Sequence, residues 1–307
     1  MSNSSLSHPP RIGEVLVAQG KLSREQAGEA AKHSVEYGMR FGEAAVALGF
    51  VQSNELEEAL AKRAPVPTFV PGEMARSIVM WHRPNSPEAE DYRSLRSALA
   101  LRWFQGAPPR RALSVISAGR YDGKSTLLAN LAVSFGLAGA QTLLVDADLR
   151  QPKQHMLFGL SNKTGLANIL DQSEFNIPHY AIAGVENLMV MVAGRSTDYT
   201  AQELLLKTDF LEYLNIQMTR YDIVLVDTSA ASLGNDYQIA AKITEGALLV
   251  TREKRTRIQR AIEMLNACDD VGIKVVGGTM VKDHDRSRPS MLRRNFSKML
   301  PRLLTED

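Results

Sequence analysis

The residues with the clearest chemical potential form a short loop, SAGRYDGKST, at residues 117–126. Its Gly123, Lys124 and Ser125 match the Gly-Lys-Ser triplet of phosphate-binding loops. In such loops backbone N–H groups and a helix N-terminus contact the phosphates, the lysine reaches the terminal phosphates, and the hydroxyl meets magnesium. Ala118 replaces the first glycine of the strict pattern, which requires ordinary backbone angles there. We expect the nucleotide contacts of the loop at Gly119, Asp122, Gly123, Lys124, Ser125 and Thr126.

Three aspartates follow two of the apolar runs of the chain. Asp146 and Asp148 lie in LLVDADLR, and Asp227 ends YDIVLVD. If both runs are parallel strands, their ends lie at the same edge of the sheet, where ligands bind. Carboxylates beside a phosphate loop require a cation, and Mg²⁺ bridging the phosphates would supply it. The alternative is that the aspartates only cap the following helices or turns, which is weaker for all three together than for one.

The elements that must position these residues are strands and crossover helices. From residue 112 onward short apolar runs alternate with segments long enough for helices, which predicts a P-loop NTPase-like α/β fold: a parallel sheet with helices on both faces. The helix after the loop is predicted over 124–139, with Leu127, Leu131 and Phe135 on one side. The predicted strands are ALSVIS, QTLLVD, NLMVMVA, DIVLVD, GALLVT and KVVGGTMV.

The chain before this fold has a different organisation. Residues 11–22 and 40–51 repeat each other, and each copy leads into a helical stretch, which predicts a small all-helical domain over 1–63. Residues 64–88 are proline-rich and predict a linker. The nucleotide-binding domain is then expected over 89–282. Residues 283–307 form a basic tail that either lies on a membrane or partner or is solvated.

Composition limits the function classes. The formal net charge is +2, from 36 basic and 34 acidic residues, so we expect no nucleic-acid partner. Cys268 is the single cysteine, which indicates a reducing compartment and a buried apolar role. The first ten residues lack the pattern of a signal peptide, and no apolar run is long enough for a membrane span. A cytoplasmic protein is therefore expected.

Two further motifs make the chain resemble a known family. An Asp-x-Asp-x-Arg motif is formed by Asp146, Asp148 and Arg150. The stretch EDYRSLR contains a Glu-x-x-Arg-x-x-Arg motif at Glu90, Arg93 and Arg96. With the loop, residues 86–282 resemble the bacterial tyrosine kinases of exopolysaccharide assembly, the BY-kinases. The cytoplasmic, exosortase-associated chain-length-determinant type is the most similar.

The resemblance implies roles for individual residues. ATP would be held by Lys124 and Ser125, with Mg²⁺ bound by Ser125, Asp148 and Asp227. Asp146 would take the proton of a tyrosine hydroxyl, so Lys124 and the three aspartates are the implied catalytic residues. Association into a homo-oligomeric ring would use Glu90, Arg93, Arg96 and Arg150. His155 also matches the family, although a structural role for it is favoured.

The resemblance further implies an ATP-dependent autokinase that acts with a separate membrane chain-length-determinant protein, placing the chain at the inner membrane through that partner. A second hypothesis is a nucleotide-binding scaffold with little kinase activity, because the last of the eight tyrosines is Tyr237 and the C-terminal tyrosine cluster of the family is missing. A third is a partitioning or positioning ATPase, which shares the sheet and loop but has a lysine near the loop start, where this chain has Gly119 and Arg120.

The repeat of the first sixty residues is similar to the cyclic-di-GMP-binding domain that precedes some secretion and pilus ATPases. Arg11 and Arg40 would contact phosphates, and Gly13 and Gly42 would allow close approach of the ligand. A protein-docking or purely structural role is the favoured alternative, because the first copy departs from the pattern at Lys21.

Overall fold

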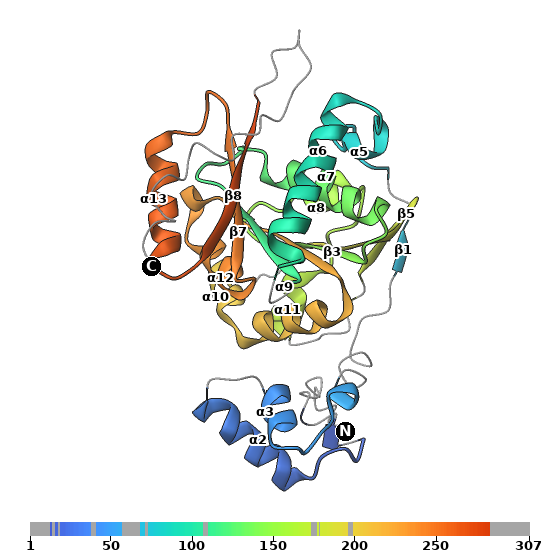
Figure 1. Cartoon of the computed structure of the whole chain (residues 1–307), viewed down its shortest axis with the longest axis vertical. Helices are drawn as coiled ribbons and strands as arrows, with labels where there is room; N and C mark the ends of the chain where they lie inside the picture. Colours follow the sequence, from blue (N-terminus) through green and yellow to red (C-terminus); the bar gives the residue numbers. More distant parts are fainter. Residues whose placement is uncertain are drawn as a thin grey trace, which may run out of the picture. The chain divides into compact units, whose positions relative to one another are not determined.

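The computed structural model describes residues 13, 16–17, 19–37, 41–56, 68–70, 73–106, 110–172, 177, 179–195 and 199–282. The chain divides into two compact units, a smaller one before residue 67, to which residues 172–177 also belong, and a larger one formed by the rest. Each unit has a hydrophobic core of its own. Figure 1 draws both units, coloured along the sequence.

The smaller unit contains helices α2 (Arg24–Glu36) and α3 (Phe41–Ala47). A capping box begins α2: the Ser23 hydroxyl accepts a hydrogen bond from the N–H of Gln26 (3.1 Å), whose side chain accepts one from the N–H of Ser23 (2.8 Å). The apolar cluster of this unit consists of Leu16, Leu22, Ala30, Ala44, Ala45 and Val51.

The two copies of the sequence repeat have the same local backbone. Gly20 and Gly49 have φ angles of +71° and +70°, in the left-handed region that favours glycine. The residue after Gly20 donates a hydrogen bond to the carbonyl of Leu16 (2.8 Å), and the residue after Gly49 donates one to that of Ala45 (2.9 Å). These helix-ending turns explain why glycine recurs at both positions.

The larger unit is built on one eight-stranded sheet with the order β1-β4-β5-β3-β6-β2-β7-β8. All neighbouring strands are parallel except β4 and β5. The strands are β1 (Thr68–Val70), β2 (Ala112–Ile116), β3 (Thr142–Asp146), β4 (Tyr180–Ile182), β5 (Val185–Met191), β6 (Ile223–Asp227), β7 (Gly246–Arg252) and β8 (Lys274–Val281). All six predicted strands are therefore present, and the predicted α/β fold is confirmed.

Helices connect these strands, and Figure 1 shows α5 and α6 together beside α7, with α13 next to β8. The π-helix η1 continues α6, and its Trp103 is buried against Gly246, where a Cβ atom would come within 2.3 Å of the indole ring. The helices of the unit are α5 (Val79–His82), α6 (Pro87–Leu99), η1 (Ala100–Phe104), α7 (Lys124–Leu137), α8 (Gln154–Leu157), α9 (Leu166–Gln172), α10 (Ala201–Leu206), α11 (Thr208–Arg220), η2 (Ala231–Leu233), α12 (Asp236–Ile243) and α13 (Ile258–Asp269).

Side chains of the central strands alternate between two hydrophobic clusters. Leu248 and Val250 of β7 belong to the larger cluster, which includes the apolar side chains of α7. Ala247 and Leu249 belong to a second cluster with residues of α12 and α13. Because successive strand residues point to opposite faces, both faces of the sheet are covered. Cys268 is buried in the second cluster, as predicted, and burial raises the pKa of its thiol to about 11.

The structure shows ordered elements where the sequence predicted a linker over 64–88. Within it, β1 pairs with β4, and α5 packs against α7 with Val79 and Met80 buried. The larger unit accordingly begins near residue 67. Both elements are only three or four residues long, so they leave no periodic pattern in a proline-rich sequence.

No helix among the described residues is long and apolar enough to cross a membrane. The predicted basic tail over 283–307 lies outside the described residues.

Candidate functional site

The phosphate loop lies between the end of β2 and the start of α7. Its backbone is tied together by the Asp122 carboxylate, which accepts a hydrogen bond from the N–H of Gly119 (2.9 Å), and by the Ser117 hydroxyl, which donates to the carbonyl of Gly119 (2.9 Å). Gly123 has a φ of +101° and directly precedes α7. Ala118 is not among the residues with positive φ, so alanine suffices there as predicted. The N-terminus of α7 therefore has the strand–loop–helix context of a phosphate site.

A cavity of about 130 Å³ lies at this helix start. The predicted residues Gly123, Lys124, Ser125 and Thr126 line it, and so does Asp148. The side chain of Lys124 is among the buried charged groups, and its ammonium lowers the pKa of both Asp148 and Asp227. The sheet thus brings one ammonium and two carboxylates together at the edge expected from the sequence.

Asp227 lies at the end of β6 with no exposed surface. Its Oδ2 accepts a hydrogen bond from Nε2 of Gln154 (2.8 Å), which also donates to the carbonyl of Ser125 (3.1 Å). Among the described residues its Oδ1 is buried without a hydrogen-bond partner. Burial raises the pKa of this carboxyl, although Lys124 and the Ser125 hydroxyl oppose the shift. One oxygen is therefore available to a cation or its water.

Asp148 is the aspartate that faces the cavity. One of its oxygens accepts a hydrogen bond from the N–H of Gln151 (3.0 Å). Burial, and then the charge of Asp227, raise its pKa to about 6, against the lowering effects of the Gln151 N–H and Lys124. This carboxylate can bind a metal ion only in its charged form.

The pKa of Asp148 leads to a prediction for pH dependence. Magnesium-dependent nucleotide affinity should fall as the pH drops through about 6, because protonation of Asp148 removes a metal-binding charge. Fluorescent-nucleotide titrations from pH 5 to pH 8, with and without Mg²⁺, measure this effect. Asp148→Asn should lose the magnesium-dependent part of the curve. An unchanged curve in the variant would contradict the assignment.

Asp146 lies deeper than the other two aspartates. It has no exposed surface and pairs in register with Asp227 across β3 and β6. Its Oδ2 accepts hydrogen bonds from the N–H groups of Lys153 (3.0 Å) and Gln154 (2.9 Å) at the start of α8. Burial, followed by the charge of Asp227, raises its pKa well above the ordinary value. In this structure Asp146 therefore caps the start of the following helix, which is the alternative role considered for the aspartates.

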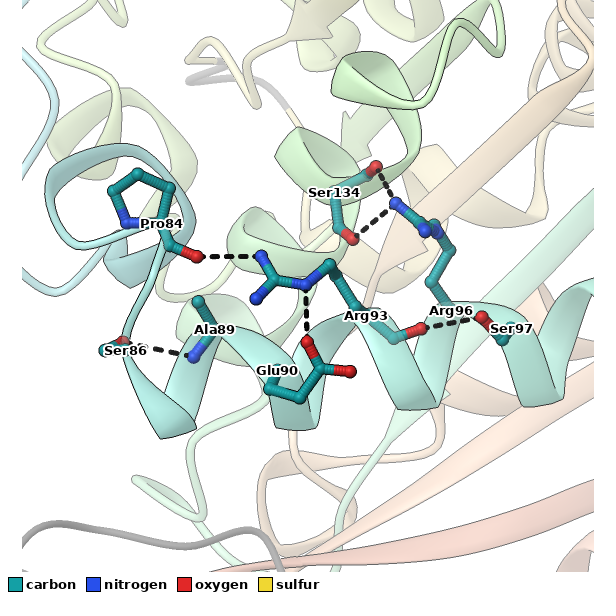
Figure 2. A network of polar contacts seen from close by, with 8 residues as sticks. All are labelled: Pro84, Ser86, Ala89, Glu90, Arg93, Arg96, Ser97 and Ser134. Carbon is teal, nitrogen blue, oxygen red and sulfur yellow. Dashed lines mark hydrogen bonds and ion pairs between the residues drawn. The ribbon is translucent and has the colours of Figure 1, made fainter.

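The predicted association motif lies on α6, where Figure 2 shows its contacts. Arg93 pairs with Glu90 through Nε (2.7 Å) and donates to the carbonyl of Pro84 (2.7 Å). Arg96 donates to the carbonyl of Ser134 on α7 (2.9 Å). Glu90 remains largely exposed, whereas Arg96 attaches α6 to the helix that begins at the phosphate loop.

Arg150, the fourth residue predicted for subunit contacts, makes a two-pronged ion pair with the buried carboxylate of Asp236 at the start of α12. This pair raises the pKa of Arg150. The ion pair links the segment after β3, which contains Asp148, to the segment after β6, which follows Asp227. It therefore restrains the relative positions of these two segments.

His155 lies apart from the nucleotide cavity. It lines a second cavity of about 370 Å³ with Asn162, Arg195 and Tyr199, and burial lowers its pKa. Its Nδ1 is buried without a hydrogen-bond partner among the described residues. These observations place it outside the phosphate chemistry.

The residues predicted for a cyclic dinucleotide are only partly described. Arg11 and Arg40 lie outside the described residues. A Cβ atom at Gly13 would come within 2.9 Å of the Phe41 ring, and one at Gly42 within 2.8 Å of the Leu56 side chain. Close packing is thus a sufficient reason for both glycines.

Several residues at the site were not predicted. Gln154 connects Asp227 to Ser125 from α8, and no motif in RQPKQH indicated this role. Arg252, from the end of β7, donates to the carbonyl of Tyr121 (3.0 Å) and lines the nucleotide cavity with Lys153. Long-range pairing of strands brings these side chains together, so only the fold could have indicated them.

A loop that leads from a buried parallel strand into a helix, with carboxylates at the ends of neighbouring strands, defines a P-loop nucleotide-binding domain. No family model matches the chain. CapB of Staphylococcus aureus, which carries the name of a tyrosine-protein kinase, is 30% identical over 201 residues, covering 65% of this chain and 86% of CapB. ExoP of Rhizobium meliloti, a succinoglycan biosynthesis transport protein, is 27% identical over 208 residues, covering 66% of this chain and 26% of ExoP.

Among solved structures, the chimeric protein CapA2B2 is similar with a TM-score of 0.61 and 25% identity, covering 75% of this chain and 98% of that one. The chain therefore belongs to the family of bacterial tyrosine kinases.

Proposed function

We propose that this tyrosine kinase is an autokinase: with Mg²⁺ as cofactor, it transfers phosphate from ATP to tyrosines of copies of this same protein. The observation that carries the proposal is the convergence of Lys124, Asp148 and Asp227 at the start of α7. In such a site the lysine, together with a Mg²⁺ ion bound by the carboxylates, would hold a triphosphate and orient it for in-line transfer. In this assignment Lys124 binds the terminal phosphates, and the loop N–H groups hold the others.

The residues present suit a magnesium ion. Among the described residues no three or more His, Cys, Asp and Glu side chains form a metal-binding group by themselves. Magnesium in phosphate sites is held by one or two carboxylates together with phosphate oxygens and water. Asp227, with its unpartnered Oδ1, and Asp148 would supply the carboxylates, and Ser125 the hydroxyl. The ion would neutralise charge that develops on the transferred phosphoryl group.

Asp146 is the proposed acceptor of the tyrosine proton, and this role stays a prediction. A base must lie within hydrogen-bond reach of the hydroxyl. The carboxylate of Asp146 is buried behind the N–H groups of Lys153 and Gln154. The proposal therefore includes a movement of the 149–154 segment when a peptide substrate binds. Asp146→Asn should then reduce turnover without weakening ATP binding, as measured by single-turnover kinetics and nucleotide titration.

The proposed setting is exopolysaccharide synthesis at the inner membrane, beside a separate membrane chain-length protein. The relative ExoP, a succinoglycan biosynthesis transport protein, supports the setting. Co-purification of the chain with a membrane chain-length protein encoded beside it would test the partnership. A nucleic-acid partner is not part of the proposal, and cyclic-di-GMP binding by the smaller unit stays a hypothesis that calorimetry with that dinucleotide would test.

Homo-oligomerisation through α6 gives a second prediction. Arg93→Ala breaks an exposed ion pair and the hydrogen bond to the Pro84 carbonyl, so it should lower the unfolding free energy by about 1–2 kcal/mol. If α6 forms the subunit contact, the wild type should form an oligomer in analytical ultracentrifugation with ATP and Mg²⁺, and the same variant should not. Arg96→Ala serves as the comparison, because it removes the contact with Ser134 and should lower stability more. Oligomers that persist in Arg93→Ala would argue against this surface.

The enzyme proposal is tested with purified protein, Mg²⁺ and γ-labelled ATP. Phosphotyrosine formation on the chain or on an added Glu-Tyr copolymer is the expected result. Nucleotide binding without any phosphotyrosine would instead favour the regulatory scaffold, for which the position of the last tyrosine at Tyr237 is the motivating observation. The relatives named as tyrosine kinases favour the enzyme over a positioning ATPase.

A further inference from the structure

A tyrosine kinase that modifies its own chain needs an accessible tyrosine, and the structure describes all eight tyrosines of the sequence. Five of them are buried or packed against the hydrophobic clusters: Tyr92, Tyr180, Tyr213, Tyr221 and Tyr237. The exposed ones are Tyr37, Tyr121 and Tyr199, with 61%, 49% and 46% of their surface accessible. The choice of acceptor within this chain is therefore among three residues.

Tyr121 differs from the other two in its surroundings. Three cationic groups lie over its ring: the guanidinium carbons of Arg120 and Arg255 at 5.3 Å from the centroid, and Nζ of Lys153 at 4.6 Å. Nη2 of Arg120 also donates to the Tyr121 hydroxyl (3.3 Å). A fourth cation, Arg252, donates to the Tyr121 carbonyl (3.0 Å).

The backbone presents this side chain outward. Tyr121 has a φ of +65° in the turn of the phosphate loop, which is unusual for a bulky residue. The hydrogen bond from Arg252, together with the Gly119–Asp122 bond in the same loop, holds that turn in place. The side chain is thus about half exposed and lines the nucleotide cavity.

Within the described part of the chain, no such cluster surrounds the other two exposed tyrosines. Tyr37 follows α2 in the smaller unit, and its ring lies 4.3 Å from that of His33. Tyr199 has one cation over its ring, Nζ of Lys207 at 3.9 Å. A phosphate ester carries a charge of nearly −2 and is stabilised by several cations that can form charge-assisted hydrogen bonds. Only Tyr121, of the three, has three such groups within reach.

From these observations we propose that Tyr121 is the acceptor of autophosphorylation, modified by a second copy of the chain, and that Arg120, Lys153 and Arg255 then bind the new phosphate. The proposal rests on the proposed function, since it names the substrate of the same kinase site.

The reaction must occur between two copies because of the geometry of phosphoryl transfer. The backbone of a phosphate loop encloses the α- and β-phosphates, which are on the leaving-group side of the γ-phosphorus. The attacking oxygen must approach from the opposite side, roughly in line with the bond that breaks. Because Tyr121 belongs to the enclosing loop, we assign the in-line attack to the hydroxyl of a second copy.

In the reaction, the Tyr121 oxygen of one copy forms a bond to the γ-phosphorus of ATP held by another. The bond from that phosphorus to the β,γ-bridging oxygen breaks, and ADP leaves. The hydroxyl proton passes to a carboxylate of the second copy's site, for which Asp146 is the proposed group. The products are phosphotyrosine and ADP, with no redox change.

A consequence follows for the nucleotide site of the modified copy. Arg120, Lys153 and Arg252 line the nucleotide cavity together with Tyr121. A phosphate at Tyr121 would draw these cations and repel the polyphosphate of the nucleotide. We expect about tenfold weaker ATP and ADP binding after modification.

The first experiment maps phosphotyrosine by mass spectrometry after the full chain is incubated with Mg²⁺ and ATP. The modification should be found at Tyr121, and Tyr121→Phe should remove most of the phosphotyrosine. Tyr199→Phe is the matched control and should leave the amount unchanged, because it alters an equally exposed tyrosine outside the nucleotide cavity. Phosphotyrosine found only at other positions would overturn the proposal while leaving the kinase function intact.

An added Glu-Tyr copolymer distinguishes failure of Tyr121 as the acceptor from failure of the kinase activity. Phosphorylation of the copolymer with none on the chain would overturn Tyr121 as acceptor but keep the kinase. If ATP binds but neither the copolymer nor the chain acquires phosphotyrosine, both the Tyr121 proposal and the kinase function are overturned.

The second experiment tests transfer between copies and its effect. A tagged Lys124→Ala copy, which carries Tyr121 but should not bind ATP, is mixed with an untagged wild-type copy. Phosphate on Tyr121 of the tagged copy is expected, and its absence there, when the wild type is modified, would overturn the two-copy step. Phosphotyrosine placed at position 121 by amber suppression should weaken ATP binding in calorimetry, and unchanged affinity would contradict the role of the cations.

Discussion

Lys124→Ala should abolish detectable binding of ATP and remove all kinase activity. The ammonium group of Lys124 lies at the nucleotide cavity, and it is the lysine of the Gly-Lys-Ser triplet. Its loss removes charge-assisted contacts with the terminal phosphates and removes the ammonium charge that opposes the raised pKa of Asp148 and Asp227. Affinity should fall at least about 100-fold, or about 3 kcal/mol. Isothermal calorimetry with ATP and Mg²⁺ measures the change.

The control for this variant is Lys163→Ala, which removes an exposed lysine outside the nucleotide cavity. It should bind ATP as the wild type does. Circular dichroism and thermal unfolding establish that Lys124→Ala is folded, since Lys124 lies in a well-packed helix. Retained tight binding in a folded Lys124→Ala variant would refute the site itself.

The sequence predicted the central strands well because they are buried on both faces and read as continuous apolar runs, as in VLVD at the end of β6. It did not predict β1 and β4, which are three residues long and pair at one side of the sheet. Strands that short carry no usable periodicity. The antiparallel pairing of β4 with β5 depends on a tight connection around Gly184, whose φ is +78°.

The site could be predicted where a motif and a strand end coincide. Lys124, Ser125, Asp148 and Asp227 met that condition, and the structure places them together. The contacts of Asp146 with the start of α8, and the cation cluster around Tyr121, depend on side chains from separate elements. Sequence spacing carries no information on such contacts.

Asp227→Asn should make the free protein more stable while it removes activity. Burial raises the pKa of Asp227, and the nearby Asp146 is also buried with a raised pKa, so charged carboxylates are disfavoured in the folded site. Asparagine keeps an oxygen to accept the hydrogen bond from Gln154 but carries no charge. A gain of about 1–2 kcal/mol in unfolding free energy is expected. Loss of the carboxylate oxygen proposed to bind magnesium should lower turnover at least about 100-fold.

The pH dependence separates this explanation from a general packing effect. When a folded-state pKa is raised, the folded protein binds the proton more tightly than the unfolded chain does, so stability falls as the pH rises from the ordinary carboxyl value through the raised one. Asp227→Asn should flatten this fall in denaturant titrations from pH 4 to pH 8, whereas the surface control Glu186→Gln should not. If the unfolding free energy changed equally with pH in the wild type and in Asp227→Asn, the charge of Asp227 would already be compensated by neighbouring groups of the folded protein. The carboxylates of the site would then need no cation from a bound nucleotide complex to be stable.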